Sequence, residues 1–469
     1  MLTLLYSVLP FVVIAIVVYC VWRAVDAART PQGAAGWAVF LIAAPWFAVP
    51  AFLVFGTHKL RRYNQTRKKT HDVVQRLAAS RDLFPPRADP AKRLSVFEQL
   101  AEMPALGGND ARLLLNGEEG FPAIFAAIDR AERYVCVQSY TFYHDAVGNA
   151  LADHLIAAVG RGVSVRLLYD GAGSYKLSRK WITRQNDAGV KVLDPRGGSG
   201  PSSKLNINFR NHRKTVLIDG VEGFVGGLNM SQTYVDGGAE FDRWRDTHLH
   251  MKGPIISQLQ LAFVEDWHWA CEELLSDELE WHPPAQPSDM TGVIISAGPN
   301  DDLDTGALFF ASAISQARSR IWIASPYFVP DSLTLGALTN AALRGCDVRI
   351  IMPERADHYL TWLAAYDYFD EVREAGVRIF RYQPGFMHQK VVLVDDEVAA
   401  VGTMNFDYRS FRLNFETMAI FHHTGFAHKV SDMLTTDLAD CIEFETPLYK
   451  QPLYLRVAAP LARLAAPIL

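Results

Sequence analysis

A short pattern of the form H-x-K-x-x-x-x-D occurs twice in this chain of 469 residues, at positions 212–219 and 388–395. Both copies carry the same three residue types in the same order: His212, Lys214 and Asp219, then His388, Lys390 and Asp395. Similar segments also surround the two copies in the same order. Because a repeated order of similar segments indicates an internal duplication, the chain is predicted to contain two copies of one domain.

The matching surroundings extend to both sides of the pattern. Downstream, residues 226–229 read Gly-Gly-Leu-Asn and residues 402–405 read Gly-Thr-Met-Asn, so Asn229 and Asn405 hold equivalent positions. Three further pairs of segments are similar. Asp246-Thr247 matches Glu416-Thr417, residues 161–166 match 344–349, and residues 188–192 match 375–379. Each half is therefore expected to have the same order of elements.

Each copy is also an apolar run rich in β-branched residues, which predicts a β-strand. Side chains alternate between the two faces of a strand, so His212 and Lys214 would share one face and Asp219 would have the other parity. The imidazole and the ammonium group could then meet one ligand, and the Asp is expected to serve folding or local charge balance. This pair suits a phosphate, which the cation can hold while the imidazole attacks or moves a proton.

Several longer segments extend these two motifs. They are Asn211-His212-Arg213-Lys214, Trp244-Arg245-Asp246-Thr247-His248, Ser325-Pro326-Tyr327-Phe328, Asn405-Phe406-Asp407-Tyr408-Arg409-Ser410 and Asn414-Phe415-Glu416. With these segments the chain resembles the phospholipase D superfamily and, within it, the bacterial cardiolipin synthases. The resemblance covers nearly the whole chain. It implies an α/β fold in which two tandem phospholipase D-like domains are related by a pseudo-twofold axis and preceded by two transmembrane helices.

The resemblance also implies one active site built from both motifs. One His attacks phosphorus and forms a phosphohistidine, while the other His protonates the leaving alcohol and then deprotonates the incoming one. His212 is the expected nucleophile and His388 the expected general acid/base, although the near symmetry allows these roles to be exchanged.

The remaining site residues follow from the same resemblance. Lys214, Lys390, Asn229 and Asn405 are expected to hold the phosphate oxygens. Asp246 and Glu416 are expected to accept a hydrogen bond from the second ring nitrogen of His212 and His388, respectively, and so to orient the rings. Asp219 and Asp395 belong to the family's motif and are kept among the catalytic candidates despite their parity. Neither a cofactor nor a metal is expected.

Two uncharged stretches near the start of the chain predict a membrane hairpin. Residues 2–22 carry no charged side chain, and a second apolar part lies near 38–55, close to the length that a membrane-spanning helix requires. Pro45 and Pro50 can be tolerated there. A basic cluster follows the second stretch, and it consists of Lys59, Arg61, Arg62, Arg67, Lys68 and Lys69. This bias places the following region in the cytoplasm and should attract anionic lipid headgroups.

The chain is expected to divide into six parts. They are a transmembrane hairpin (1–57), a basic juxtamembrane linker (58–109), a first phospholipase D-like domain (110–280), a connection (281–288), a second such domain (289–442) and an apolar C-terminal tail (443–469). Amphipathic helices such as Phe121–Ala131 and Leu333–Leu343, alternating with apolar strands, indicate α/β architecture. The tail is expected either to lie on the bilayer or to pack as a final helix.

Composition limits the possible partners. The net charge of −5 and the pI of about 6.3 weaken a nucleic-acid function. The five cysteines form no C-x-x-C pair, and Cys136 and Cys346 lie in or beside apolar runs, so buried free thiols are expected. Such thiols agree with a reducing, cytoplasmic location.

Four functions are weighed against these observations. The first is cardiolipin synthesis, in which a phosphatidyl group passes between two phosphatidylglycerol molecules and glycerol is released. The alternatives are a phospholipase D that hydrolyses lipid to phosphatidic acid, a membrane-tethered nuclease, and a non-catalytic scaffold. The expected location is the bacterial inner membrane, as a multi-pass protein with its catalytic domains on the cytoplasmic side. The oligomeric state and the use of phosphatidylethanolamine stay open.

Overall fold

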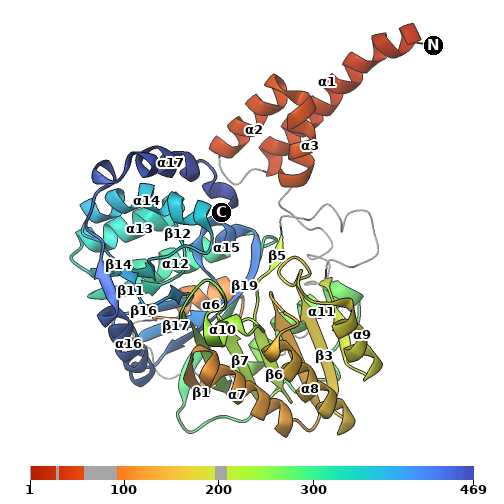
Figure 1. Cartoon of the computed structure of the whole chain (residues 1–469), viewed down its shortest axis with the longest axis vertical. Helices are drawn as coiled ribbons and strands as arrows, with labels where there is room; N and C mark the ends of the chain where they lie inside the picture. The colour runs from red at the N-terminus through yellow and green to blue at the C-terminus, as the bar shows by residue number, and fades with distance from the viewer. Residues whose placement is uncertain (1, 28–30, 57–91, 196–208) are drawn as a thin grey trace.

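A computed structural model describes residues 2–27, 31–56, 92–195 and 209–469 (Figure 1). It consists of an α/β body and three N-terminal helices that project from one end of that body. Helices cover both faces of one long, mixed sheet, as the alternation of helical and strand patterns predicts.

The order of strands in the sheet is nearly the same in the two halves, read from opposite ends. The first half contributes, from its edge inward, β4 (Lys191–Leu193), β3 (Ser164–Tyr169), β2 (Tyr134–Ser139), β6 (Thr215–Ile218), β7 (Glu222–Gly226), β9 (Thr247–Lys252) and β1 (Leu106–Leu115). The second half continues with β10 (Met290–Ala297), β19 (Asn414–His422), β17 (Val398–Gly402), β16 (Val391–Val394), β11 (Arg320–Ala324), β13 (Asp347–Pro353), β14 (Arg378–Tyr382) and β20 (Cys441–Glu443). The halves join where β1 and β10 pair antiparallel. This arrangement agrees with the expected pseudo-twofold relation.

The helices divide into two layers. One layer belongs to the separate cores of the two halves and comprises α7 (Asn116–Arg130), α8 (Ala146–Gly160), α9 (Arg179–Asp187), α12 (Thr305–Gln316), α13 (Ser332–Leu343) and α14 (Tyr359–Glu374). The other layer comprises α11 (Ile255–Cys271) and α16 (Thr424–Ala439), which bury their apolar sides in one core that both halves share. The helices expected from Phe121 and Leu333 onward are confirmed as α7 and α13. Burial of apolar surface from both halves in this shared core stabilises their association.

The described residues from 2 to 56 form one long apolar helix and two short ones. α1 (Leu2–Ala27) is long and apolar enough to cross a membrane. The second expected span is divided into α2 (Pro31–Ala43) and α3 (Pro45–Phe55) at Ala44, whose φ is −141°. Proline has no N–H to continue the helical hydrogen bonds, so Pro45 starts a new helix. The expectation of a second unbroken membrane-spanning helix is therefore not confirmed.

The expected linker is only partly a linker. Its basic cluster lies outside the described residues. From Lys92 onward the chain packs against the second half through α6 (Ser95–Ala101), whose Phe97 is buried in that half's core. Arg93 pairs with Asp395 at 2.9 Å and with Glu397 at 2.7 Å. The chain thus contacts the second half before it forms the first strand of the first half.

All five cysteines lie in the described part of the chain and are free thiols. Cys136 and Cys346 are buried, as expected. Burial raises the pKa of the Cys136 thiol to about 12, which keeps it in the unreactive thiol form.

The carboxylates of the motif aspartates bind backbone N–H groups of neighbouring strands and not the histidines. β6 and β16 begin at the residues after Lys214 and Lys390, so each strand starts later than expected and each Asp occupies the turn at its far end. Asp219 accepts hydrogen bonds from the backbone N–H groups of Glu132, Arg133 and Tyr134 at 2.8–2.9 Å. Asp395 accepts the equivalent bonds at the start of β11, from Arg318, Ser319 and Arg320.

This arrangement corrects two expectations. The strand-parity argument does not apply to the histidines and lysines, which precede the strands. Asp219 and Asp395 also leave the group of catalytic candidates, because their carboxylates hold the chain that enters β2 and β11.

We predict that Asp219→Asn will lower the free energy of unfolding by about 1–3 kcal/mol, because three backbone N–H groups share that carboxylate. Asn tolerates the positive φ of 53° at this turn, so the backbone should keep its path. Unfolding of the purified protein in detergent measures the change, with exposed Asp302→Asn as the matched control. A variant of wild-type stability that has no activity would contradict the structural role.

Candidate active site

The two H-x-K motifs meet at the boundary between the halves, and each is hydrogen-bonded to the other half. His212 follows β5 (Arg210–Asn211), which pairs with the start of β19. His388 follows β15 (Phe386–Met387), which pairs with β8 (Trp244–Arg245). The backbone N–H of His212 donates to the carbonyl of Phe415 at 2.9 Å, and that of His388 donates to the carbonyl of Arg245 at 2.7 Å. Backbone pairing thus brings both histidines to one place.

The carboxylates that orient the histidines are exchanged between the halves. Nδ1 of His212 lies 2.9 Å from both carboxylate oxygens of Glu416. Nδ1 of His388 lies 2.7 Å from Oδ2 of Asp246. The expected pairing within each half is therefore wrong. The cause is the crossed pairing of short strands, which sets Glu416 beside the first motif and Asp246 beside the second.

The two carboxylates are held in different ways. Glu416 accepts hydrogen bonds from the hydroxyl of Thr403 at 2.6 Å and from the side-chain amide of Asn414 at 3.1 Å. The position equivalent to Thr403 in the first half is Gly227, and a Cβ there would come within 1.8 Å of Oδ1 of Asp246. Gly227 thus leaves room for the carboxylate of Asp246. Thr403, at the equivalent position, instead donates a hydrogen bond to the carboxylate of Glu416.

Both motif lysines are buried. Nζ of Lys214 donates to the carbonyl of His212 at 2.7 Å, and Nζ of Lys390 donates to the carbonyl of His388. Burial lowers the pKa of Lys214 to about 7 and that of Lys390 to about 8. An anion bound between them would favour the charged form of both. The lysines therefore suit a site that is filled by a phosphate.

Before a phosphate is bound, the electrostatic surroundings favour the neutral form of both histidines. Burial lowers the pKa of both imidazoles, and the charges of Lys390 and Lys214 lower the pKa of His388 further. Because each Nδ1 faces a carboxylate, the neutral ring carries its proton there and leaves Nε2 free to attack or accept a proton.

The two carboxylates differ in pKa. Burial by itself would raise the pKa of Glu416, but His212, Lys214 and Thr403 together bring it below its usual value. Burial raises the pKa of Asp246 to about 6, against the opposing effect of Lys390. The negative charge of Glu416, beside His212, is therefore more stable than that of Asp246, beside His388.

The two asparagines have different surroundings. Asn229 accepts hydrogen bonds from the backbone N–H of Thr141 at 3.1 Å and from the hydroxyl of Ser139, and its amide donates to the hydroxyl of Tyr234. In contrast, Oδ1 of buried Asn405 has no hydrogen-bond partner among the described residues. Asn229 thus supports the loop that carries Thr141, whereas the unpaired Oδ1 of Asn405 can accept a hydrogen bond from a hydroxyl of the substrate.

The comparisons with known proteins identify the family of this chain. A family model described as "Cardiolipin synthase, PLD-like domain" matches residues 124–267 and 310–438. The chain belongs to this cardiolipin synthase family of phospholipase D-like proteins. It is 40% identical to cardiolipin synthase A of Pseudomonas putida over 95% of each chain. It is 41% identical to cardiolipin synthase A of Pseudomonas aeruginosa over 95% of this chain and 93% of that protein.

Solved structures support the fold. The phosphatidylserine synthase of Haemophilus influenzae aligns with a TM-score of 0.59 at 14% identity, over 81% of this chain and 100% of that one. The polyphosphate kinase of Porphyromonas gingivalis aligns with a TM-score of 0.50 at 12% identity, over 75% of this chain and 52% of that one. At these identities the likeness concerns architecture alone.

Aromatic side chains that sequence reasoning did not assign surround the histidines of this family member. The Tyr140 ring meets His212 edge-on at 5.0 Å between centroids. Tyr234 and Trp244 lie 5.7 and 5.4 Å from the His388 ring. Tyr140 lies in residues 139–142 (Ser-Tyr-Thr-Phe), which parallel residues 325–328 (Ser-Pro-Tyr-Phe), and Trp244 lies in the segment 244–248. Their positions beside the rings depend on tertiary packing.

Buried ion pairs hold the residues next to the motif histidines in place. Arg245 donates two hydrogen bonds to Asp437 of α16, at 2.6 and 2.9 Å, and so joins the first half to a helix of the second. Asp437 also accepts a hydrogen bond from Gln389 at 2.8 Å. Arg213, the variable position of the first motif, pairs with Asp266 at 2.7 Å. The residue between each His and Lys is thus a structural anchor.

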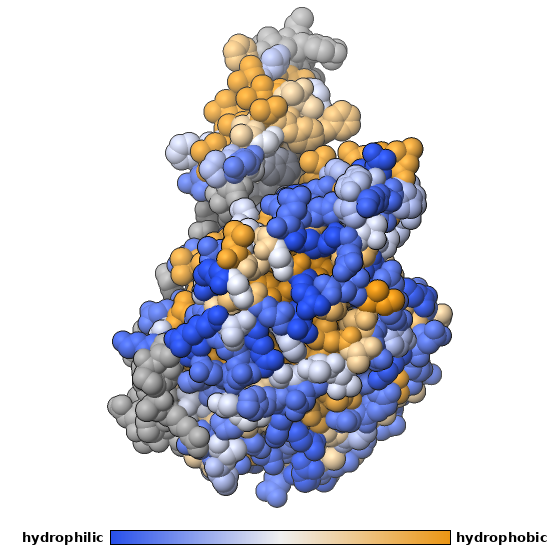
Figure 2. All heavy atoms as spheres, turned by 90° about the vertical axis from the view of Figure 1, so that its left-hand side faces the viewer, coloured by the Kyte–Doolittle hydropathy of each residue, from blue (hydrophilic) through white to orange (hydrophobic). Residues whose placement is uncertain are grey.

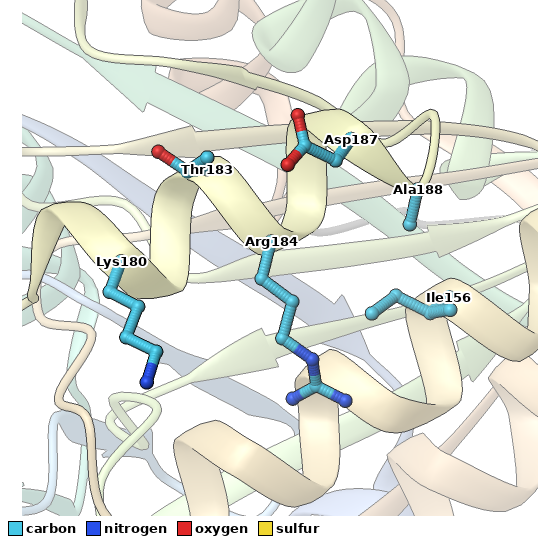
Figure 3. A pocket seen from close by; sticks show the side chains of 6 residues that line it. All are labelled: Ile156, Lys180, Thr183, Arg184, Asp187 and Ala188. Atoms are coloured by element: carbon cyan, nitrogen blue, oxygen red, sulfur yellow. The ribbon is translucent and has the colours of Figure 1, made fainter.

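A separate hollow lies on the surface between α8 and α9 (Figure 3). Its lining residues are Ile156, Lys180, Thr183, Arg184, Asp187 and Ala188. None of them belongs to the motifs, and Arg184 is paired with Asp153. The catalytic groups therefore lie elsewhere, at the boundary between the halves.

We predict that Glu416→Gln will change the Nδ1 resonance of His212 and leave that of His388 nearly unaltered, and that Asp246→Asn will do the reverse. Each change should also lower kcat about 10- to 100-fold, because the orienting group is lost. Nitrogen NMR of histidine-labelled protein measures the first effect, with assignments from the His→Ala variants. An effect of Glu416→Gln on His388 alone would contradict the crossed pairing.

We also predict that kcat/KM will fall as the pH rises through the pKa values of about 7 and 8 of Lys214 and Lys390. The neutral amines cannot neutralise the phosphodiester, and kcat/KM reports the free enzyme. At saturating lipid, kcat should fall only at higher pH, because the bound anion keeps both lysines charged. Constant kcat/KM from about pH 6 to 9 would contradict this assignment.

Proposed function

We propose that this protein transfers a phosphatidyl group from one phosphatidylglycerol to another and releases cardiolipin and glycerol. The observation that carries the proposal is the convergence of two histidines, two buried lysines and two exchanged carboxylates in one site. The proteins of 40–41% identity over nearly the full chain are named cardiolipin synthase A, which supports the same reaction.

The proposed first step forms a phosphohistidine. Nε2 of His212 attacks phosphorus, and the bond from phosphorus to the glycerol oxygen breaks. The negative charge of the bound phosphodiester favours the protonated form of His388, which gives its Nε2 proton to that oxygen as glycerol leaves. The ammonium groups of Lys214 and Lys390 and the side-chain N–H of Asn405 donate hydrogen bonds to the phosphoryl oxygens as their charge changes. The anionic Glu416 stabilises the positive ring of His212, which supports this histidine as the nucleophile.

The second step is the reverse with a different alcohol. Neutral His388 takes the proton from the terminal hydroxyl of the second phosphatidylglycerol. The resulting oxygen attacks phosphorus, and the bond from phosphorus to Nε2 of His212 breaks. Both histidines return to their starting forms, so no cofactor or metal takes part in the proposed cycle.

Exclusion of water supports transfer over hydrolysis. His212 is 8% exposed and His388 is 6% exposed, so an acceptor that fills the site would displace the little water that reaches it. A phospholipase D reaction would use the same phosphohistidine with water as the acceptor. The two reactions differ only in the second step.

Two arginines on the His212 side support an anionic substrate. Burial and the nearby charge of Arg210 lower the pKa of Arg409. Burial and the charge of Asp170 raise the pKa of Tyr140, whose ring contacts His212, and both guanidinium groups oppose that rise. The equivalent positions in the other half are Phe386 and Thr233. This added positive charge favours phosphatidylglycerol over a zwitterionic phospholipid.

We predict that Arg409→Gln will lower kcat/KM for phosphatidylglycerol about 10-fold and weaken the preference over phosphatidylcholine as phosphatidyl donor, because one positive charge is lost. Arg409→Lys keeps the charge and is the matched control. Competition between the two lipids in mixed micelles measures the preference. Unchanged preference in Arg409→Gln would remove this residue from lipid selection.

The proposed location is the bacterial inner membrane, with the catalytic body on the cytoplasmic side. α1 provides one span, and the apolar α2–α3 segment provides the return, so that both termini lie inside. The sequence supports this topology through the basic cluster after residue 57, which should also attract anionic lipids.

Mass spectrometry of lipids tests the function directly. Purified protein in detergent is incubated with phosphatidylglycerol alone, beside a His212→Ala control. Cardiolipin and glycerol that are absent in the control are the expected result. Phosphatidic acid in place of cardiolipin would make the protein a hydrolase, and unchanged lipid would overturn both reactions.

A further inference from the structure

The C-terminal helix α17 (Leu453–Arg463) is fixed to the second half by one of its faces. Leu455, Ala459 and Ala462 are buried on that face, in the same core as residues of α14. Arg463 adds ion pairs to Asp367 at 3.0 Å and to Glu371 at 3.3 Å, both on α14. The expectation of a final packed helix is therefore confirmed for this face.

The other face of α17 is apolar and exposed. Its large side chains are between 55% and 79% exposed, and they are Leu453, Tyr454, Val457, Leu461 and Leu464. At 3.6 residues per turn these positions fall within an arc of about 100°. A continuous exposed apolar stripe of this kind marks a contact surface rather than ordinary solvent-facing helix.

The position and charge of this stripe indicate what it contacts. α17 lies at the end of the body that faces the apolar helices α1–α3 (Figure 1), and Figure 2 shows apolar surface on those helices and again just below them, at the level of α17. Residues 446–469 contain no Asp or Glu, while Lys450 and Arg456 are exposed. Exposed Tyr449 and Tyr454 suit the headgroup region of a bilayer.

We propose that α17 is a membrane-contact helix that lies in the interface of the bilayer. Leu453, Val457, Leu461 and Leu464 enter the boundary between headgroups and acyl chains, and the opposite face stays on α14. A second copy of the chain would also cover an apolar stripe, but the lack of acidic residues and the exposed cations favour an anionic lipid surface. The proposal rests on the proposed function in that the substrate lies in the same bilayer.

The packing beneath α17 connects this surface with the active site. α14 carries Phe369, whose ring stacks on Phe328 of β12 (Phe328–Val329) at 6.0 Å between centroids. β12 pairs with β18 (Phe406–Asp407), which directly follows Asn405. Contact of α17 with the bilayer therefore sets the height and tilt of the active site relative to the lipid headgroups.

Depth-dependent fluorescence quenching tests the contact without using activity. The full chain, with Leu461→Cys in a Cys271→Ser background, is labelled with an environment-sensitive dye and reconstituted at low density in phosphatidylglycerol-containing vesicles. Leu274→Cys, another exposed apolar position, is the control. Lipids that carry a quencher near the headgroup should quench the dye at 461 at least threefold more than the dye at 274.

Equal quenching at the two positions would overturn the proposal. Quenching at 461 that depends on protein density and not on the quencher lipid would also overturn it, in favour of a second copy.

A double variant tests the consequence for catalysis. Val457→Glu combined with Leu461→Glu should raise the apparent KM for phosphatidylglycerol in vesicles about 10-fold and leave activity on a short-chain, monomeric phosphatidylglycerol unchanged. Both side chains point away from α14, so folding should not suffer. An unchanged KM in vesicles would overturn the proposal. Wild-type failure on the short-chain lipid would instead count against the proposed function.

Discussion

The exchange of short strands between the halves is the constraint on which the active site depends. Each motif histidine donates its backbone N–H to a carbonyl of the opposite half, and each ring is held by a carboxylate from that half. The shared core beneath α11 and α16 and the ion pair between Arg245 and Asp437 keep the halves from separating. Neither half alone contains a histidine with its carboxylate, so the duplicated chain forms one site and not two.

Near symmetry of the backbone coexists with clear differences in electrostatics. The His212 side has an anionic Glu416, a hydroxyl partner in Thr403 and two arginines. The His388 side has Asp246, whose pKa is raised by burial, and the aromatic rings of Tyr234 and Trp244. Two roles that the motif leaves interchangeable are thus given different surroundings, and the anionic partner is on the side of the proposed nucleophile.

The sequence predicted the duplicated α/β architecture, the helices α7 and α13, and the residues that meet in the site, because repeats and hydrophobic periodicity are local signals. It did not predict which carboxylate serves which histidine, since that pairing depends on two-residue strands between distant segments. A membrane-spanning helix can contain proline, yet Pro45 divides the expected second span at Ala44. Strand parity correctly predicted a structural role for the motif aspartates. The argument itself does not hold, because the histidines and lysines precede the strands. The packing of Arg93 on the second half had no local signal at all.

The difference between Gly227 and Thr403 has a consequence for the evolution of the chain. A Cβ at position 227 would collide with Asp246, whereas Glu416 accepts a hydrogen bond from the hydroxyl at position 403. Recombination between the two repeats that copied one of these positions without its carboxylate would damage the site. Gly227 with Asp246, and Thr403 with Glu416, must therefore be inherited as pairs, although the members of each pair lie 13 to 19 residues apart. The duplicated halves have become genetically distinct parts that can no longer replace each other.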